Sequence, residues 1–322
     1  MNEAAVSDFL QRAGLGVPIR MQALSGGVSS DIWRVELPER LVCVKRALPR
    51  LRVAQVWEAP IERNRYERQW LQVARKAAPA SAPQVLAWDD DAGLFAMEHL
   101  AYPVWKTVLR EGHADPAFAS QVGERLAAIH GATAGDPKVA ERFATDAIFY
   151  AIRLEPYLVA TAPRHPDLAE ALVDLAKRTA ATRHCLVHGD VSPKNILVGA
   201  EGPIFLDAEC AWYGDPAFDL AFCLNHMLLK CIWVPDARAG FMQCFDALAS
   251  AYLSRMADAS ALEERAATLL PGLLLGRIDG KSPVEYLDEA QRALVRSAAR
   301  RMLCAPSPTL KHLRDAWQRF ST

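Results

Sequence analysis

A short polar stretch, LVHGDVSPKNILV at residues 186–198, places oxygen-bearing side chains between two apolar runs. Asp190 and Asn195 share this stretch, and Asp207 ends the next apolar run of the chain. Carboxylate and amide oxygens that converge from adjacent loops suit Mg²⁺, which binds a few protein oxygens together with phosphate and water. The carboxylate of Asp190 could then accept a proton from a hydroxyl nucleophile. The pattern therefore predicts metal-assisted chemistry on a hydroxyl group.

Each of these residues also has a simpler interpretation when it is taken alone. Gly, Asp, Ser, Pro and Asn all favour turns, so the stretch could be a solvent-exposed connection without a chemical role. The combined order is more specific. It consists of His188-Gly189-Asp190, an asparagine five positions later, and an aspartate at the end of the next strand. This order favours a catalytic loop over an ordinary turn.

A phosphate-binding lysine would have to lie on a strand that follows a glycine-rich turn. Alternation along residues 41–45 places Lys45 on the same face as Cys43, which favours a side chain directed at a cleft over one that extends to solvent. The preceding turn consists of Ser25, Gly26 and Gly27. Such pairs of glycines are usually ordinary hairpin turns, but here the small residues could cover a phosphate closely.

An acidic partner for this lysine is expected on the helix predicted from about residue 58 to 78. Helical projection places Glu67 within the apolar arc, beside Trp70 and Leu71. Glu62 falls nearer the polar arc. Glu67 is therefore predicted to form the ion pair, with an ordinary surface glutamate as the alternative.

The elements that hold these residues fall into two regions. Alternating residues predict strands over 31–37 and 41–47 and a strand pair within 83–100, with the helix inserted between them. The chain beyond residue 100 shows mainly helical signals.

Three patterns in that second region indicate helix starts. They are Asp115-Pro116, Asp215-Pro216 and Ser282-Pro283-Val284-Glu285. A helix is also expected over 166–182, and the last of the three starts should hold Tyr286 and Leu287 inward. The chain is thus predicted to be α+β, with a small β-rich N-terminal lobe over residues 1–100 and a larger, mainly helical lobe over residues 101–322.

The order HGD-x-x-x-x-N resembles the protein-kinase-like superfamily, and within it the aminoglycoside phosphotransferase and choline kinase group. The resemblance covers roughly residues 20–230 and implies ATP and Mg²⁺ as cofactors. It also implies Asp190 as catalytic base, Asn195 and Asp207 as metal ligands, and Asp219 as a brace for the catalytic loop. The strand that ends near residue 100 would be the hinge between the lobes. Its adenine-binding residues would be Met97, Glu98 and Leu100.

One subgroup of that family is closer than the others. Residues 44–52, followed by Trp57, and residues 207–214 are similar to 5-methylthioribose kinase. That subgroup has a paired arginine near the end that takes part in substrate recognition, and Arg300-Arg301 is the matching pair here. A solvated helix face is the alternative for these two arginines.

The composition excludes several kinds of partner. A net charge of −1 offers no basic surface for nucleic acid or for an anionic membrane. Seven scattered cysteines without a CxxC pair predict reduced, mostly buried thiols. The first residues lack the features of a secretory signal, and no uncharged apolar run reaches the length of a membrane span. We expect a cytoplasmic protein that binds a small hydroxyl substrate and binds neither nucleic acid nor a membrane. The sequence leaves a homodimer possible.

The expected activity is ATP-dependent phosphorylation of a hydroxyl on a small metabolite, such as 5-methylthioribose or a related sugar. Two alternatives are an antibiotic phosphotransferase of the aminoglycoside type and a nucleotide-binding pseudokinase that regulates a partner. Residues 241–322 contain eleven Lys and Arg against nine Asp and Glu, so they do not form the acidic cradle that a polycationic antibiotic needs. A protein kinase is weaker still, because the chain has no DFG or APE motif.

Overall fold

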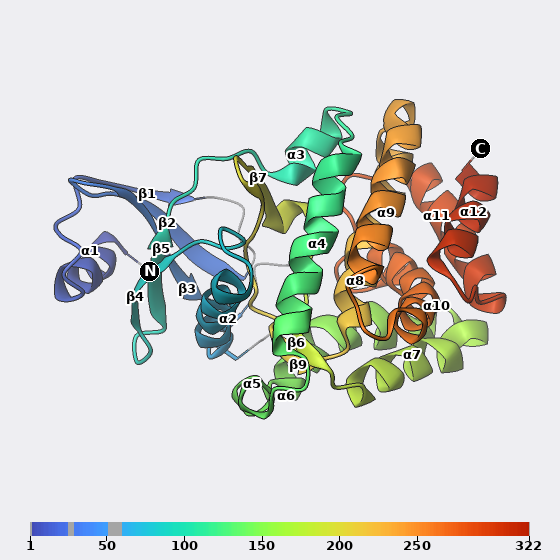
Figure 1. Ribbon diagram of the computed structural model, residues 1–322, viewed down its shortest axis with the longest axis horizontal. Helices are drawn as coiled ribbons and strands as arrows, with labels where there is room; N and C mark the ends of the chain where they lie inside the picture. The colour runs from blue at the N-terminus through green and yellow to red at the C-terminus, as the bar shows by residue number, and fades with distance from the viewer. Residues whose placement is uncertain (1, 25–28, 51–59, 322) are drawn as a thin grey trace.

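The computed structural model describes residues 2–24, 29–50 and 60–321. A small lobe built on a five-stranded sheet is followed by a larger helical lobe (Figure 1). The α+β class and the two-lobed architecture expected from the sequence are confirmed. The boundary at residue 100 stays a prediction, because the largest apolar core contains residues from both sides of it, among them Phe95 and Trp105.

The sheet of the small lobe directs its two faces at different partners. Its strands are β1 (Arg20–Leu24), β2 (Ser30–Glu36), β3 (Leu41–Ala47), β4 (Val85–Asp89) and β5 (Leu94–Glu98). They follow the order β1-β2-β3-β5-β4, and each neighbouring pair is antiparallel. Alternation along β3 sends Val42 and Val44 to one apolar core and Cys43 to the larger core. Lys45 shares the face of Cys43, as predicted.

Helices pack against the sheet of the small lobe. Helix α1 (Glu3–Arg12) buries Val6 and Phe9 in the core that contains Val42 and Val44. Sequence analysis did not predict this helix. Helix α2 (Arg63–Ala77) lies within the helix that was predicted, and its buried face joins the larger core.

The larger lobe is a set of packed helices. They are α3 (Trp105–Arg110), α4 (Pro116–Thr133), α5 (Pro137–Arg142), α6 (Asp146–Phe149), α7 (Ala169–Ala181), α8 (Pro216–Trp233), α9 (Arg238–Leu253), α10 (Ala259–Asp279), α11 (Glu289–Cys304) and α12 (Leu310–Ser321). A π-helix, η1 (Tyr150–Val159), follows α6. The short 3₁₀ turns are η2 (Ala162–Arg164), η3 (Pro166–Leu168), η4 (Pro193–Asn195) and η5 (Pro235–Ala237). Helix α8 packs against α9 and α10 and is almost entirely buried. A helix buried on nearly all sides needs apolar residues around most of its circumference, and α8 has them.

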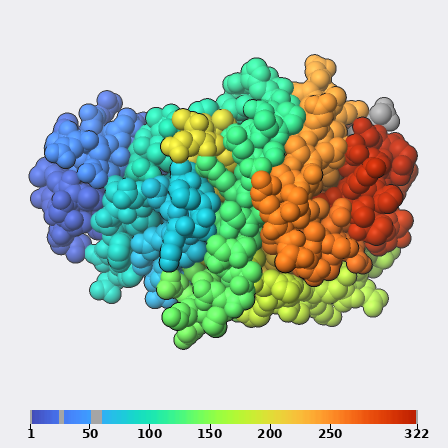
Figure 2. Space-filling view, viewed as in Figure 1, coloured from blue at the N-terminus to red at the C-terminus, as the bar shows by residue number. Residues whose placement is uncertain are grey.

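Two short strand pairs lie where the lobes meet. Strand β6 (Cys185–Val187) pairs with β9 (Trp212–Gly214), and β7 (Ile196–Gly199) pairs with β8 (Gly202–Phe205). The β7–β8 hairpin reaches the surface between the small lobe and the nearby helices, as the yellow region of Figure 2 shows. These strand pairs carry the polar residues of the catalytic-loop pattern.

The segment between α10 and α11 differs from the expectation. Ser282 does not begin a helix, because its hydroxyl and its carbonyl both accept hydrogen bonds from Arg277. Helix α11 begins at Glu289 instead, where Asp288 and Gln291 form the capping box. The expected helix start at residues 282–285 was therefore wrong. The residues left in the non-helical segment include Tyr286 and Leu287.

Two further expectations can be compared with the described residues. All seven cysteines are free, and only Cys304 among them is exposed. No single helix of the described chain is long and apolar enough to cross a membrane. By length and composition alone, the bent pair 216–233 and 235–253 passes that test, with an angle of 120° between its halves.

The contact of α4 with α9 gives a prediction about stability. A methyl group added at Gly123 would lie 2.4 Å from the carbonyl oxygen of Leu248, which belongs to the backbone of α9 and cannot rotate away. We expect Gly123→Ala to lower the free energy of unfolding by about 1–3 kcal/mol through overpacking. Thermal or urea unfolding followed by circular dichroism measures the change.

Gly131→Ala is the matched control on the same helix, because a methyl group there meets no atom within 4 Å. Alanine has the higher helix propensity, so this variant should keep or raise the stability by up to about 1 kcal/mol. Equal destabilisation by the two substitutions would contradict the close packing of α4 on α9.

Candidate active site

The β7–β8 hairpin brings two oxygen-bearing side chains to one of its ends. Asn195 directly precedes β7 and Asp207 follows β8, in a register that pairs Ile196 with Phe205. The N–H of Leu206 donates to the carbonyl oxygen of Asn195 at 2.8 Å, which extends the pairing toward Asp207. The side-chain amide of Asn195 donates through Nδ2 to the carbonyl oxygen of Asp190 at 3.1 Å. Its Oδ1 therefore stays available as a metal ligand.

Asp207 holds an unusual backbone conformation. Its φ is +65°, in the left-handed region that costs free energy for residues other than glycine. Such conformations persist where the surrounding structure enforces them, and they gather at functional sites. Together, an amide oxygen and a carboxylate at one hairpin end suit a hard cation such as Mg²⁺. The described residues contain no group of three or more His, Cys, Asp and Glu side chains that could hold a metal, so further ligands would have to come from phosphate and water.

Lys45 connects the sheet with α2 and with the metal-ligand candidate. Its ammonium donates to Glu67 at 2.8 Å and also contacts the carboxylate of Asp207. Only 2% of the Lys45 side chain is exposed. Burial alone would lower the pKa of this ammonium, but the carboxylates of Asp207 and Glu67 outweigh burial and raise it. Lys45 is therefore charged, and the predicted choice of Glu67 over Glu62 agrees with the observed contact.

Asp219 anchors the backbone of the catalytic loop. This aspartate lies in the first turn of α8 and has no exposed surface. Its Oδ2 accepts from the N–H of His188 at 2.7 Å, and its Oδ1 accepts from the N–H of Gly189 at 2.8 Å. His130 on α4 lies 3.2 Å from the same carboxylate. Two buried backbone donors are satisfied in this way, which fixes the loop on the helical lobe.

His188 holds the loop from the other side. The N–H of Asp190 donates to Nδ1 of His188 at 3.1 Å, so the proton of the ring is on Nε2, which donates to the carbonyl of Leu206 at 3.0 Å. Burial lowers the pKa of His188, which agrees with a neutral ring. The edge of the ring packs on Trp70 of α2, with centroids 4.6 Å apart. The loop is thus attached to the small lobe as well.

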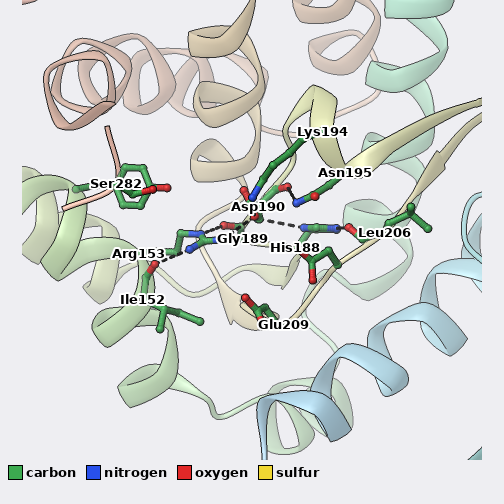
Figure 3. A network of polar contacts seen from close by, with 12 residues as sticks. Ile152, Arg153, His188, Gly189, Asp190, Lys194, Asn195, Leu206, Glu209 and Ser282 are labelled. Carbon is green, nitrogen blue, oxygen red and sulfur yellow. Dashed lines mark hydrogen bonds and ion pairs between the residues drawn. The ribbon is translucent and has the colours of Figure 1, made fainter. Parts of the chain in front are cut away.

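Two cations flank the carboxylate of Asp190 (Figure 3). Nη2 of Arg153 lies 2.9 Å from Oδ2, and Nζ of Lys194 lies 3.3 Å from the same oxygen. Burial would raise the pKa of Asp190, but Arg153 and Lys194 outweigh it and lower the pKa below its usual range. Asp190 is therefore an ionised carboxylate held in a fixed orientation.

Sequence analysis missed Arg153. This residue lies on the π-helix η1, and its guanidinium also donates to the carbonyl oxygens of Gly189 and Ile152. Such π-helical turns are rare and often lie at functional sites. The available signal was a lone arginine in the largely apolar stretch 147–154. Its connection with Asp190 could not be foreseen, because 37 residues separate the two.

Arg63 is a second residue whose role was not predicted. It lies at the start of α2, and its Nε donates to Glu209, two positions after Asp207, at 3.0 Å. Its Nη2 donates to the carbonyl oxygens of Ser29 and Leu48 at 2.7 and 2.6 Å. One guanidinium therefore joins α2, the sheet and the segment that follows the metal-ligand candidate.

The predicted hinge residues Met97, Glu98 and Leu100 lie at the end of β5 and just after it. The N–H groups of Glu98 and His99 already donate within the sheet, to Gln84 and Leu41 at 2.9 and 3.1 Å. Leu100 follows them, and its backbone makes no hydrogen bond within the described residues. Its N–H and C=O are thus unpaired within the described residues. Met97 is nearly buried and belongs to the larger core.

The remaining predicted residues do not join this site. Ser25, Gly26 and Gly27 lie outside the described residues. Arg300 forms an ion pair with Asp167 at 2.6 Å, and the guanidinium of Arg301 lies 5.0 Å from the Phe320 ring centroid. Both arginines are on α11, and in the described part of the chain neither contacts the catalytic loop. These contacts are compatible with the alternative of a solvated helix face, and the substrate role stays a prediction.

Gly189 gives a prediction about the loop. Its φ is +79°, and a methyl group there would lie 2.7 Å from both Cβ and the carbonyl oxygen of Cys210. Gly189→Ala should therefore lower the free energy of unfolding by about 2–4 kcal/mol, from left-handed strain and from the clash together. Chemical unfolding of the purified variant measures this loss.

Gly135→Ala separates the two causes. Gly135 has a φ of +69°, but a methyl group added there meets no atom within 4 Å. This control carries the backbone strain alone and should cost about 1–2 kcal/mol. If both variants lost the same stability, the contact with Cys210 would not be the constraint at Gly189.

Solved structures with this arrangement of elements include two small-molecule kinases. One is amicoumacin kinase hAmiN in complex with AMP-PNP, Ca²⁺ and Ami, with a TM-score of 0.59, 15% identity and 96% coverage of each chain. The other is a choline/ethanolamine kinase family protein from Mesorhizobium loti, with a TM-score of 0.56, 17% identity, and coverage of 98% of this chain and 99% of that one. At these identities the similarity shows the fold, which is the protein-kinase-like fold expected from the sequence.

Curated relatives are similar over much of the chain. A methylthioribose kinase of Escherichia coli O45:K1 (strain S88 / ExPEC) is 27% identical over 67% of this chain and 59% of its own length. A methylthioribose kinase of Geobacillus thermodenitrificans (strain NG80-2) is 23% identical over 85% of this chain and 78% of its own length. The chain thus spans only about three fifths of the Escherichia coli relative. The model of the family described as "Phosphotransferase enzyme family" matches residues 20–259, and the chain therefore belongs to this phosphotransferase family.

Proposed function

We propose that this protein transfers the γ-phosphoryl group of ATP to a hydroxyl of a small metabolite. The observation that carries the proposal is the contact of Lys45 with both Glu67 and Asp207, next to an ionised Asp190. This is the set of charges that phosphoryl transfer needs, because catalysis of that reaction is mainly positioning and electrostatic stabilisation. The names of the curated relatives make 5-methylthioribose the first acceptor to test.

The nucleotide side of the site would consist of Leu100, Lys45 and the two metal-ligand candidates. The backbone of Leu100 would bind the adenine edge. Lys45, held by Glu67, would orient the phosphates. Asn195 and Asp207 would hold Mg²⁺, which supplies positive charge to the phosphate oxygens when bound.

On the acceptor side, Asp190 would orient the hydroxyl and accept its proton. Its lowered pKa keeps the carboxylate free of a proton at neutral pH, and Arg153 fixes its direction. Lys194 is 52% exposed beside it, so this ammonium can also approach the phosphoryl group in transit. Charge placed in this way stabilises the transition state more than the ground state.

The charges near Asp190 bear on the choice between acceptors. Arg153 and Lys194 lie directly beside the carboxylate that the hydroxyl of a polycationic aminoglycoside would have to reach. Like charges at such distances are repulsive. The site therefore favours a neutral or anionic acceptor over a polycationic antibiotic. The free cysteines fit a reducing compartment such as the cytoplasm, where ATP is abundant.

An ADP-release assay tests the proposed function. MgATP would be combined with 5-methylthioribose, choline, homoserine and kanamycin in turn, and ADP would be measured with a coupled enzyme system. We expect release that depends on one of the small hydroxyl compounds, and ³¹P NMR should show the new phosphate ester. If no acceptor led to ADP release although the protein bound ADP, a nucleotide-binding pseudokinase would be favoured.

Two variants tie this activity to the site. Asp190→Asn should lower kcat by about 10²–10⁴-fold, because general-base catalysis is lost. This variant leaves the buried Arg153 without its carboxylate and could lose stability. Asp207→Asn is the second variant, since Lys45 keeps Glu67 as a partner. Near-normal turnover in either folded variant would contradict the mechanism, and melting temperatures establish folding.

A pH profile tests the role of Arg153. Because the charge of Arg153 lowers the pKa of Asp190, Arg153→Met should move the acidic limb of kcat/KM to higher pH. The comparison is Arg183→Met, whose guanidinium pairs with Asp146 away from Asp190. This control should leave the acidic limb in place. An unshifted limb in an active Arg153→Met would show that Arg153 does not set the ionisation of Asp190.

A further inference from the structure

Basic side chains gather in the helical lobe beside the catalytic loop. Lys106 comes from α3, Lys230 from α8 and Arg277 from α10. The transfer of a phosphoryl group as described above uses none of them. All three act electrostatically on His226, as does Lys194 of the catalytic loop. The four cations therefore lie in one neighbourhood, which we call the basic cluster.

Lys230 has an environment that is rare for a lysine. Its side chain is almost completely buried, and its ammonium lies 3.8 Å from the ring centroid of Tyr286 and 4.2 Å from that of Trp233. Within the described residues it makes no hydrogen bond and no ion pair. Burial, with the nearby charge of Lys106, lowers the pKa of Lys230 to about 6. Cation–π contacts offset only part of this burial, so an anion beside the ammonium would be strongly favourable.

Arg277 is the second group with unused binding capacity. Its Nη1 donates to the hydroxyls of Tyr157 and Ser282 at 3.3 and 3.0 Å, and no carboxylate of the described chain lies within ion-pair distance. Its Nε is buried and has no acceptor among the described residues. The hydroxyl of Tyr286 is likewise buried, and it too has no partner in the described part of the chain. Buried donors of this kind are rare in folded proteins, because each costs about 1–3 kcal/mol when it is left unpaired.

Little negative charge balances this cluster. Glu285 pairs with Lys106 at the exposed edge, where 67% of the glutamate side chain is in solvent. Burial and then the charges of Arg277, Lys230, Lys194 and Lys106 hold the pKa of His226 well below its usual range, so this imidazole is neutral. The positive charge of Arg277 is therefore not matched by a carboxylate of the described residues, and burial keeps Lys230 mostly uncharged near neutral pH.

Direct contacts connect the cluster with Asp190. Arg153 pairs with Asp190, and its guanidinium lies 5.8 Å from the ring centroid of Tyr157. The hydroxyl of Tyr157 accepts from Arg277. Figure 3 shows Ser282, another partner of Arg277, on the same side of Asp190 as Arg153. Arg153 and Tyr157 thus link Asp190 to Arg277 through direct contacts.

We propose that the acceptor carries a carboxylate or phosphate group, which binds to Arg277, Lys230 and the Tyr286 hydroxyl while its alcohol lies at Asp190. This inference rests on the proposed function and names the substrate class of the same site. The anionic group would satisfy the unpaired donors of Arg277 and Tyr286. It would also favour the charged form of Lys230. 5-Methylthioribose carries no such group, so an anionic sugar or hydroxy acid should be the better substrate.

Matched pairs of acceptors test the proposal. ADP release would be compared for glycerol against glycerate and for ribose against ribose 5-phosphate. We expect kcat/KM to be at least about tenfold higher for the anionic member of a pair, which corresponds to one good charge-assisted contact. A response to glycerate alone or to ribose 5-phosphate alone would identify the carboxylate or the phosphate as the recognised group.

Three variants assign the effect to the cluster. Arg277→Gln, Lys230→Met and Tyr286→Phe should each raise KM for the anionic acceptor by about tenfold or more, with a smaller change in kcat. Tyr286→Phe removes a single unpaired hydroxyl, so it folds even if the other two are unstable. The matched control is Arg255→Gln, at the end of α9, where the arginine pairs with Glu124 in solvent at 2.9 Å. This control should leave KM unchanged.

Calorimetry separates failure of this inference from failure of the proposed function. Glycerate and inorganic phosphate would be titrated into the protein with MgADP present. Binding that is weakened by Arg277→Gln but not by Arg255→Gln would support the anion site even if no acceptor were phosphorylated. Turnover of neutral and anionic acceptors at equal rates, with anion binding unaffected by Arg277→Gln and Tyr286→Phe, would overturn the inference and leave the kinase activity standing.

Discussion

The buried contact of Lys45 with Glu67 and Asp207 is the interaction on which the arrangement of the two lobes depends. It joins the sheet, α2 and the loop after β8, which are far apart along the chain. Removing these charges from water is costly, and the cost is offset only when every member has its partner. Any displacement of α2 or of the Asp207 loop would leave a charge unpaired in the interior. The ion cluster therefore allows a narrow range of lobe positions, which the proposed phosphoryl transfer would require.

The rest of the site is built outward from that contact by neutral packing and hydrogen bonds. His188 packs on Trp70 of α2, and its Nδ1 accepts a hydrogen bond from the backbone of the catalytic loop. The position of the loop is therefore fixed relative to α2, the helix that carries Glu67. Asp219 fixes the same loop to α8. Asp190 is thereby held between two rigid elements. Its orientation is set before any acceptor arrives, which lowers the entropic cost of the reactive geometry.

Local patterns predicted the residues whose positions follow from strand and helix periodicity. Lys45 could be placed by alternation along β3 and Glu67 by its place in an apolar helical arc, because each depends on one element only. Asn195 and Asp207 followed from the ends of adjacent strands. Arg153 and Arg277 could not be found in this way, because tertiary packing alone brings η1 and α10 to the loop. The start of α11 was misplaced for a related reason. The hydroxyl of Ser282, which was expected to cap the helix, accepts a hydrogen bond from Arg277 instead.

The same physics links the base to the choice of acceptor. A buried carboxylate would ordinarily gain a proton, and Asp190 stays ionised because Arg153 and Lys194 lie against it. Those cations keep the proposed base ionised, and they place positive charge directly beside it. Arg277 adds charge that no carboxylate of the described chain neutralises, and Lys230 is a buried amine that an anion would favour in its charged form. Under the proposed mechanism, a polycationic substrate would be repelled by Arg153 and Lys194, whereas an anionic one would relieve the cost of burying Arg277 and Lys230. The proposed preference for anionic acceptors thus rests on the cations that keep Asp190 ionised, together with Arg277 and Lys230.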